Sequence, residues 1–102
     1  MIDLKLMQNR VYQNKINKGF NVTDVNLEFC LAYNELSEAF RAYCDKKDDL
    51  GEELADVIIY LLGIAEISGL DLEREIMSKI EKNEKRKYIE HSDGTWTKIE
   101  PE

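Results

Sequence analysis

The stretch from Gly51 to Leu62 constrains the fold of this chain more than any other. It starts with acidic residues and continues as Val57-Ile58-Ile59-Tyr60-Leu61-Leu62, so that a helix formed here is apolar on every face. Such a helix belongs in the middle of a helical bundle. Glu53 and Asp56 are three residues apart and share one face of this helix. A carboxylate among apolar neighbours is costly unless it is paired or binds a metal ion.

Helical spacing of apolar residues extends over most of the chain, and the single Pro is at position 101. We therefore predict an all-α fold of the four-helix-bundle type, with Gly19 and Gly69 as helix ends. The expected helices cover residues 2–16, 24–46, 49–67 and 71–88. The turn residues 92–94, followed by the alternating residues 95–99, predict a short C-terminal hairpin or an extended tail.

A chain of 102 residues is expected to form one domain, with a core over 24–90 and a tail over 91–102. The partner helices that one chain of this size supplies can hardly cover the central helix on all sides. Ile58, Ile59 and Leu62 are therefore expected to meet a second copy of the chain across a symmetric interface.

The formal net charge of −7 argues against binding of nucleic acid polymers or of anionic membranes. No apolar run approaches the roughly 20 residues of a membrane span, and no secretion signal is evident. Cys30 and Cys44 fall on the same predicted helix, too far apart to form a disulfide. Reduced thiols and a cytoplasmic location are the expectation.

A second acidic pair, Glu35 and Glu38, flanks the apolar face of the preceding helix. One such pair is common on a solvated helix. Two pairs that face each other across a helix hairpin predict a site for a hard divalent cation, either Mg²⁺ or Mn²⁺. The only His is His91 and there is no Cys/His cluster, which disfavours di-iron and zinc sites.

Phosphate chemistry is the natural use of a carboxylate-bound magnesium ion. Lys79, Asn83 and Arg86 share one face of the last predicted helix, at spacings of four and three residues. They could bind the phosphates whose other side meets the metal. The simpler interpretation is a solvated helix end whose cations complement the helix dipole.

The order Glu35-x-x-Glu38 and then Glu53-x-x-Asp56 resembles the signature of the MazG-like, all-α nucleoside triphosphate pyrophosphohydrolases. The two halves in this order are specific, whereas either half alone is not. The resemblance covers roughly residues 24–90. Four stretches carry it, namely residues 34–40, 52–61, 69–73 and 79–86.

The resemblance implies Mg²⁺-dependent hydrolysis of a nucleoside triphosphate between the α and β phosphates, giving a monophosphate and pyrophosphate. It implies that the metal ligands are Glu35, Glu38, Glu53 and Asp56. Glu38 is our first choice for the residue that orients or deprotonates the attacking water. Lys79 and Asn83 match positions that contact the phosphates or the nucleotide. The family forms dimers or tetramers, so a homodimer or a homotetramer is expected.

Two other functions stay open at this point. A phosphoribosyl-ATP pyrophosphohydrolase would share the fold and the metal site but not the substrate. A non-catalytic helical dimer would use the acidic cleft to bind a basic partner or a structural cation. The preferred base is not indicated, and Phe20 or Trp96 could either stack on a base or simply pack.

Overall fold

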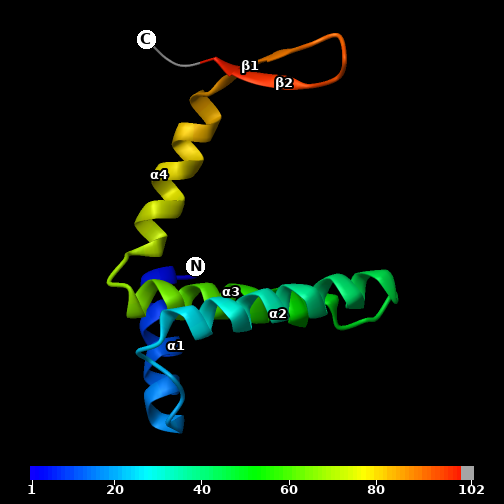
Figure 1. Cartoon of the computed structure of the whole chain (residues 1–102). Coiled ribbons are helices and arrows are strands. Elements are labelled where there is room, and N and C mark those ends of the chain that lie inside the picture. The colour runs from blue at the N-terminus through cyan, green and yellow to red at the C-terminus, as the bar shows by residue number, and fades with distance from the viewer. Residues whose placement is uncertain (100–102) are drawn as a thin grey trace. The chain divides into compact units, whose positions relative to one another are not determined.

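The structure of the chain is a computed structural model that describes residues 1–99. Its fold is all-α with a short C-terminal hairpin, as predicted (Figure 1). The last three residues of the predicted tail lie outside the described part. The elements are the helices α1 (Leu4–Lys18), α2 (Val25–Cys44), α3 (Leu50–Ile67) and α4 (Leu72–Lys85), and the strands β1 (Lys87–Glu90) and β2 (Trp96–Ile99).

Contacts within the chain divide it into two compact units, one over Met1–Leu72 and the other from Glu73 onward. The first unit contains α1, α2 and α3, and the second contains α4 and the hairpin. The organisation of residues 1–102 as one domain stays a prediction.

Short polar side chains begin the first two helices. The Asp3 carboxylate accepts a hydrogen bond from the Leu6 amide at 2.9 Å, and the Asp24 carboxylate accepts one from the Leu27 amide at 3.1 Å. Both acceptors satisfy amides that have no partner inside the helix. Asp49 occupies the same position before α3 without a side-chain capping bond.

Glycines end α1 and follow α3, as the sequence predicts. Gly19 has a φ of 73° and Gly69 a φ of 71°, in the left-handed region where a Cβ is unfavourable. The Gly19 amide donates to the Ile16 carbonyl at 3.1 Å. Because this Gly is the stop, α1 continues two residues beyond the predicted end at residue 16.

The three helices of the first unit pack through small residues. α2 and α3 lie side by side as an antiparallel hairpin, and α1 packs across α3 (Figure 1). A Cβ built on Gly63 would lie 3.5 Å from the Val11 side chain, so α1 approaches α3 closely at this point. Leu62, expected at a surface between copies, belongs to the core of its own chain instead. The buried apolar residues are Ala32, Ala39, Ala42, Leu62, Ile64 and Ala65.

Gln8 ties α1 to the turn that follows α3. Its side chain is 2% exposed. The Nε2 amide donates to Glu66 Oε2 at 2.8 Å and to the Leu70 carbonyl at 2.6 Å, while Oε1 accepts from the Leu72 amide at 3.1 Å. All of these groups belong to the first unit, so the buried Gln8 amide bonds to backbone atoms of the turn that follows α3.

In the second unit the prediction that the last helix reaches Tyr88 is wrong, because α4 ends at Lys85. The Arg86 amide donates to the Asn83 carbonyl at 3.2 Å and closes the last turn. Tyr88 then pairs with Lys98 in the antiparallel hairpin. Strand pairing satisfies the backbone groups of this segment in place of a further helical turn. None of the helices in residues 1–99 has both the length and the apolar character needed to cross a membrane.

Candidate metal centre

An acidic cluster lies between α2 and α3. Glu35 and Glu38 come from neighbouring turns of α2, and Glu53 comes from the first turn of α3. One carboxylate oxygen from each of the three lies within 4.8 Å of the other two. Glu35 and Glu53 are partly buried, and Glu38 is exposed. The helix hairpin thus brings together side chains from the two sequence motifs.

Asp56 is the fourth predicted ligand and lies one turn beyond Glu53 on α3. It is not a member of the group of three within the 4.8 Å limit. Its side chain is partly buried, and its negative charge helps to raise the pKa of both Glu35 and Glu53. The structure therefore groups three predicted ligands and places Asp56 beside them.

Burial and mutual repulsion both act on the cluster. The pKa of Glu35 is raised first by desolvation and then by the charges of Glu38, Asp56 and Glu53. The pKa of Glu53 is also raised, by desolvation first and then by Asp49 and Glu38. Crowded carboxylates favour the protonated form unless a cation compensates them.

One oxygen of the cluster is buried and lacks a protein partner. Glu53 Oε2 has no hydrogen-bond partner among residues 1–99. Buried polar atoms in folded proteins nearly always have a partner, which can be a bound ion. Three converging carboxylates that include such an atom fit a hard divalent cation with oxygen ligands, such as Mg²⁺ or Mn²⁺.

A small pocket of about 220 Å³ opens on one side of the cluster. Three carboxylates line it, those of Glu38, Asp49 and Glu53. Two cations line it as well, Arg41 from the last turn of α2 and Lys47 from the loop after α2. Lys46, which precedes Lys47, has a φ of 54°, a left-handed conformation that is uncommon for lysine. Neither cation of this pocket was predicted from the sequence.

A larger groove of about 950 Å³ lies between α1 and α3. Phe20, Ile59 and Tyr60 contribute apolar and aromatic surface. The charged residues that line the groove are Arg10, Lys15 and Glu28. The pKa of Tyr60 is raised by desolvation and then by the charges of Glu35 and Glu28. Tyr60 therefore lies close enough to the acidic cluster to feel its charge while also lining the groove.

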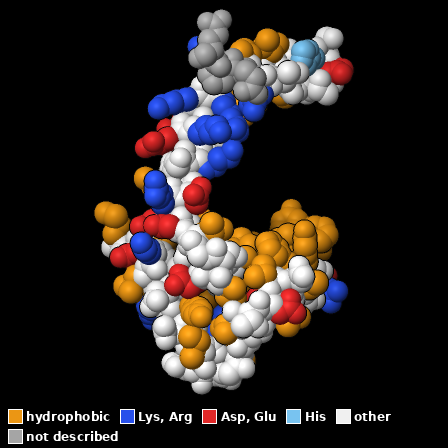
Figure 2. Space-filling view, turned by 60° about the vertical axis from the view of Figure 1, so that its left-hand side comes forward, with side chains coloured by type: hydrophobic (Ala, Val, Ile, Leu, Met, Phe, Trp, Pro, Cys, Tyr) orange, Lys and Arg blue, Asp and Glu red, His pale blue; other side chains and the backbone are white. Residues whose placement is uncertain are grey.

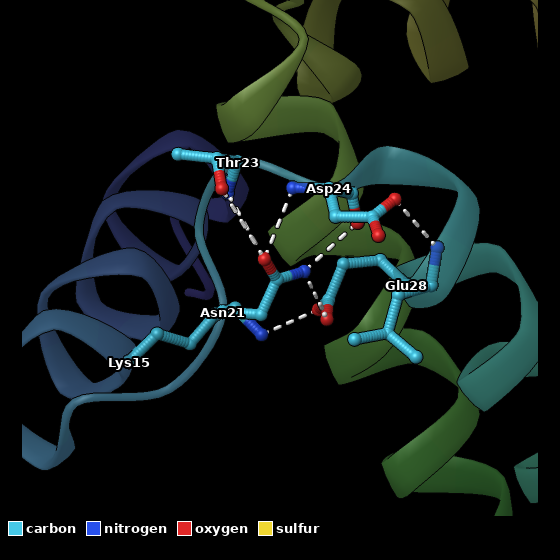
Figure 3. Close-up of polar contacts among 6 residues, drawn as sticks. Lys15, Asn21, Thr23, Asp24 and Glu28 are labelled. Atoms are coloured by element: carbon cyan, nitrogen blue, oxygen red, sulfur yellow. Dashed lines mark hydrogen bonds and ion pairs between the residues drawn. The ribbon is translucent and has the colours of Figure 1, made fainter.

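Lys15 and Glu28 belong to a network of polar contacts around a buried carboxylate (Figure 3). Glu28 is 1% exposed, and the Lys15 ammonium donates to its Oε1. Asn21 Nδ2 donates to Glu28 Oε2 at 3.1 Å, and Asn21 Oδ1 accepts from the Asp24 amide at 3.0 Å. The Lys15 ammonium also lies 5.9 Å from the centre of the Tyr60 ring. The pairing of Lys15 with Glu28 was not predicted from the sequence because the two residues come from different helices.

The predicted phosphate-binding residues Lys79, Asn83 and Arg86 lie on α4, in the second unit, or directly after it. Arg86 Nη1 donates to Asn83 Oδ1 at 3.0 Å. The pKa of Lys79 is lowered first by the positive charge of Arg86, then by desolvation and by Lys82. Figure 2 shows Lys and Arg side chains gathered on this unit. An anion bound among them would relieve the repulsion.

Comparisons with known proteins agree with these motifs. The sequence model of the MazG-like family matches residues 27–100, a range that includes both acidic pairs and all of α4. No curated protein and no solved structure matches the chain. Because the family match extends over most of the sequence, the chain belongs to the MazG-like family.

Proposed function

We propose that the protein is a Mg²⁺-dependent nucleotide pyrophosphohydrolase that cleaves a (d)NTP between the α and β phosphates. Membership of the MazG-like family indicates a function of the pyrophosphohydrolase type and dependence on a divalent cation. The observation that carries the proposal is the cluster of three carboxylates within 4.8 Å, which includes the unpartnered oxygen of Glu53.

The proposed roles follow from the positions of the acidic residues. Glu35, Glu38 and Glu53, with Asp56 beside them, would hold Mg²⁺, and Mn²⁺ could replace it. When bound, the ion neutralises phosphate charge and lowers the pKa of a bound water. Glu38, the exposed member of the cluster, orients the attacking water or accepts its proton. The water oxygen bonds to the α phosphorus, and the bond from this phosphorus to the bridging oxygen breaks, releasing pyrophosphate.

Lys79, Asn83 and Arg86 are proposed to contact the phosphates. Their support is the resemblance of α4 to the family and the mutual repulsion of its cations, which an anionic ligand would offset. Replacing Lys79 with Met should raise KM for the triphosphate. Replacing Lys5 with Met provides a control, because this lysine lies at the start of α1 and pairs with Asp71 at 3.6 Å.

A homodimer or homotetramer is also proposed. Large apolar side chains stay exposed on α2 and α3, among them Tyr33, Phe40 and Ile58. Figure 2 shows hydrophobic side chains gathered on the first unit. Exposed apolar patches of this kind mark interaction sites. Sedimentation equilibrium should show a species heavier than the monomer, and Phe40→Lys, a substitution outside the groove, should shift it toward the monomer.

The decisive experiment measures pyrophosphate release from a panel of (d)NTPs and phosphoribosyl-ATP, with Mg²⁺ and with EDTA. We expect Mg²⁺-dependent release from at least one nucleotide, and ¹⁸O from labelled water should appear in the monophosphate. Glu53→Gln and Asp56→Asn should abolish release and keep the helical circular dichroism signal. Release of pyrophosphate from phosphoribosyl-ATP alone would instead support a phosphoribosyl-ATP pyrophosphohydrolase. No release from any compound by folded, magnesium-loaded protein would overturn the proposal.

A further inference from the structure

Two hollows of different chemistry flank the acidic cluster in the first unit. The larger groove adjoins it through Tyr60, and the smaller pocket shares Glu38 and Glu53 with it. Neither hollow was expected from the sequence. A nucleotide has an aromatic end and an anionic end. Two sites of different chemistry beside one metal centre therefore determine which end of a bound nucleotide lies in which site. This orientation of the substrate rests on the proposed function, since it requires the substrate to be a nucleotide.

The groove suits the nucleoside end of the substrate. Its walls are mostly apolar and include the rings of Phe20 and Tyr60, on which a flat base can stack. The Lys15 ammonium has three N–H donors, and its bond to Glu28 uses one of them. A remaining donor can meet an acceptor atom on the edge of a base. The buried Glu28 carboxylate holds this ammonium in place.

The smaller pocket suits the anionic end. Arg41 and Lys47 line it together with the carboxylates of Glu38, Asp49 and Glu53. Within residues 1–99 neither cation forms an ion pair with a carboxylate. Because its carboxylates outnumber its cations, the pocket matches a phosphate anion when a metal ion compensates Glu38 and Glu53 and contacts the same phosphate. The volume of about 220 Å³ leaves room for a pyrophosphate group but is small for a whole nucleotide.

The sequence positions along α2 place these features in order. Glu28 and Glu35 are two turns apart, or about 10.5 Å along the helix axis, which is comparable to the length of a nucleoside. Arg41 follows Glu38 by one turn in the same direction. The order along the helix is therefore the groove, the acidic cluster and the smaller pocket.

We infer that the substrate lies along α2, with its base in the groove against Lys15 and Tyr60 and its leaving pyrophosphate in the pocket between Arg41 and Lys47. In this orientation Lys15, Arg41 and Lys47 are substrate-binding residues, and Glu28 is a positioning residue that acts through Lys15. The acidic cluster faces the α phosphate, between the two ends.

The first arm of the test removes the Lys15–Glu28 ion pair at the groove. A Lys15→Met/Glu28→Gln double variant is preferred because Lys15→Met alone leaves a buried carboxylate unpaired and could unfold the chain. The KM for the preferred nucleotide should rise about tenfold, and the differences in KM between nucleotides with different bases should become smaller. The inhibition constant of pyrophosphate, which has no base, should not change. Lys18→Met, an exposed residue of the same helix, is the control and should alter neither value.

The second arm removes the cations of the pocket. An Arg41→Ala/Lys47→Ala variant should raise the inhibition constant of pyrophosphate about tenfold and leave the ranking of bases unchanged. Lys46→Asn is the control, because it removes one positive charge next to Lys47 in the sequence and Asn tolerates the left-handed backbone. Rescue by Arg41→Lys should be partial, since lysine keeps the charge but not the fork of donors.

The inferred orientation requires that each pair of substitutions affect its own end of the substrate. The orientation is overturned if the groove variant weakens the binding of pyrophosphate as much as the binding of the nucleotide, or if the pocket variant changes the order of preference among bases. It is also overturned if neither variant, in an active enzyme, changes the KM for nucleotides or the inhibition constant of pyrophosphate. Absence of hydrolysis by the unsubstituted protein would instead overturn the proposed function, which separates the two failures.

Discussion

Glu35 on α2 and Glu53 on α3 face each other with carboxylate oxygens no more than 4.8 Å apart, and each has a raised pKa. A pKa that is higher in the folded than in the unfolded state means that the folded protein binds the proton more tightly. Tighter proton binding by such a group stabilises the folded protein, and this contribution is fully present below the unfolded pKa of about 4.3. It is lost as the pH rises through the higher pKa of the folded state. Without metal, the cluster should therefore oppose folding at neutral pH.

The first prediction concerns this pH dependence. In EDTA, Glu53→Gln should shift the urea midpoint upward at about pH 7, and the gain should shrink toward about pH 4, where the wild-type carboxylate is protonated. Glu52→Gln, which alters the preceding and exposed residue, is the control and should show a smaller and flatter change. A gain that grows as pH falls would contradict the assigned repulsion.

The second prediction concerns metal binding. Magnesium should raise the melting temperature of the protein because it binds the folded carboxylate cluster and not the unfolded chain. At 100 times the dissociation constant the added stability is about 2.7 kcal/mol. The shift should disappear in Glu53→Gln, and potassium at matched ionic strength should not reproduce it. The melting temperature is measured by circular dichroism at increasing magnesium concentrations. A melting temperature that does not change with magnesium would count against the site.

The third prediction concerns the proton acceptor. Glu38→Gln should lower kcat by about 10²–10⁴ at saturating magnesium, the range typical of a lost general base. Glu52→Gln should keep the wild-type rate, because Glu52 is not a member of the cluster. Steady-state pyrophosphate release, with helicity measured on the same samples, tests this. Full activity of Glu38→Gln would assign the role to another carboxylate.

The fourth prediction concerns Gln8. Its buried amide makes three hydrogen bonds, so Gln8→Ala should lower the free energy of unfolding by about 1–3 kcal/mol. Gln13→Ala replaces an exposed residue of the same helix and should change this free energy by roughly 0.5 kcal/mol or less. Urea unfolding of both variants gives the comparison, and equal effects would show that the Gln8 bonds add no net stability.

The fifth prediction compares two glycines of the α3 region. Gly69→Ala should destabilise the protein by about 1 kcal/mol, because the φ of 71° is unfavourable for a residue with a Cβ. Gly51→Ala, inside α3, should stabilise it by roughly 0.5–1 kcal/mol, since nothing lies within 4 Å of the added Cβ. Effects of the same sign would show that backbone conformation does not govern these positions.

Local rules account for what could be predicted about the fold. The capping carboxylate of Asp24 and the left-handed Gly19 and Gly69 act within a turn of their own helix, so the helix ends they set are visible in the sequence. The end of α4 was misplaced at Tyr88 because strand pairing with Lys98, ten residues away, decides it. The helical spacing of apolar residues does not indicate that two such distant residues pair in a hairpin.

The sequence alone determined that Glu35 and Glu38 share one helix face, as do Glu53 and Asp56, since a spacing of three residues does so in any α-helix. Only the tertiary structure decided that three of them converge while Asp56 lies beside them, and that one oxygen of Glu53 is buried. It also decided that Lys15 meets Glu28, that Leu62 is internal, and that Arg41 and Lys47 border the cluster. The physical reason is that residue spacing sets which side chains share a helix face, whereas the packing of one helix on another sets which faces meet.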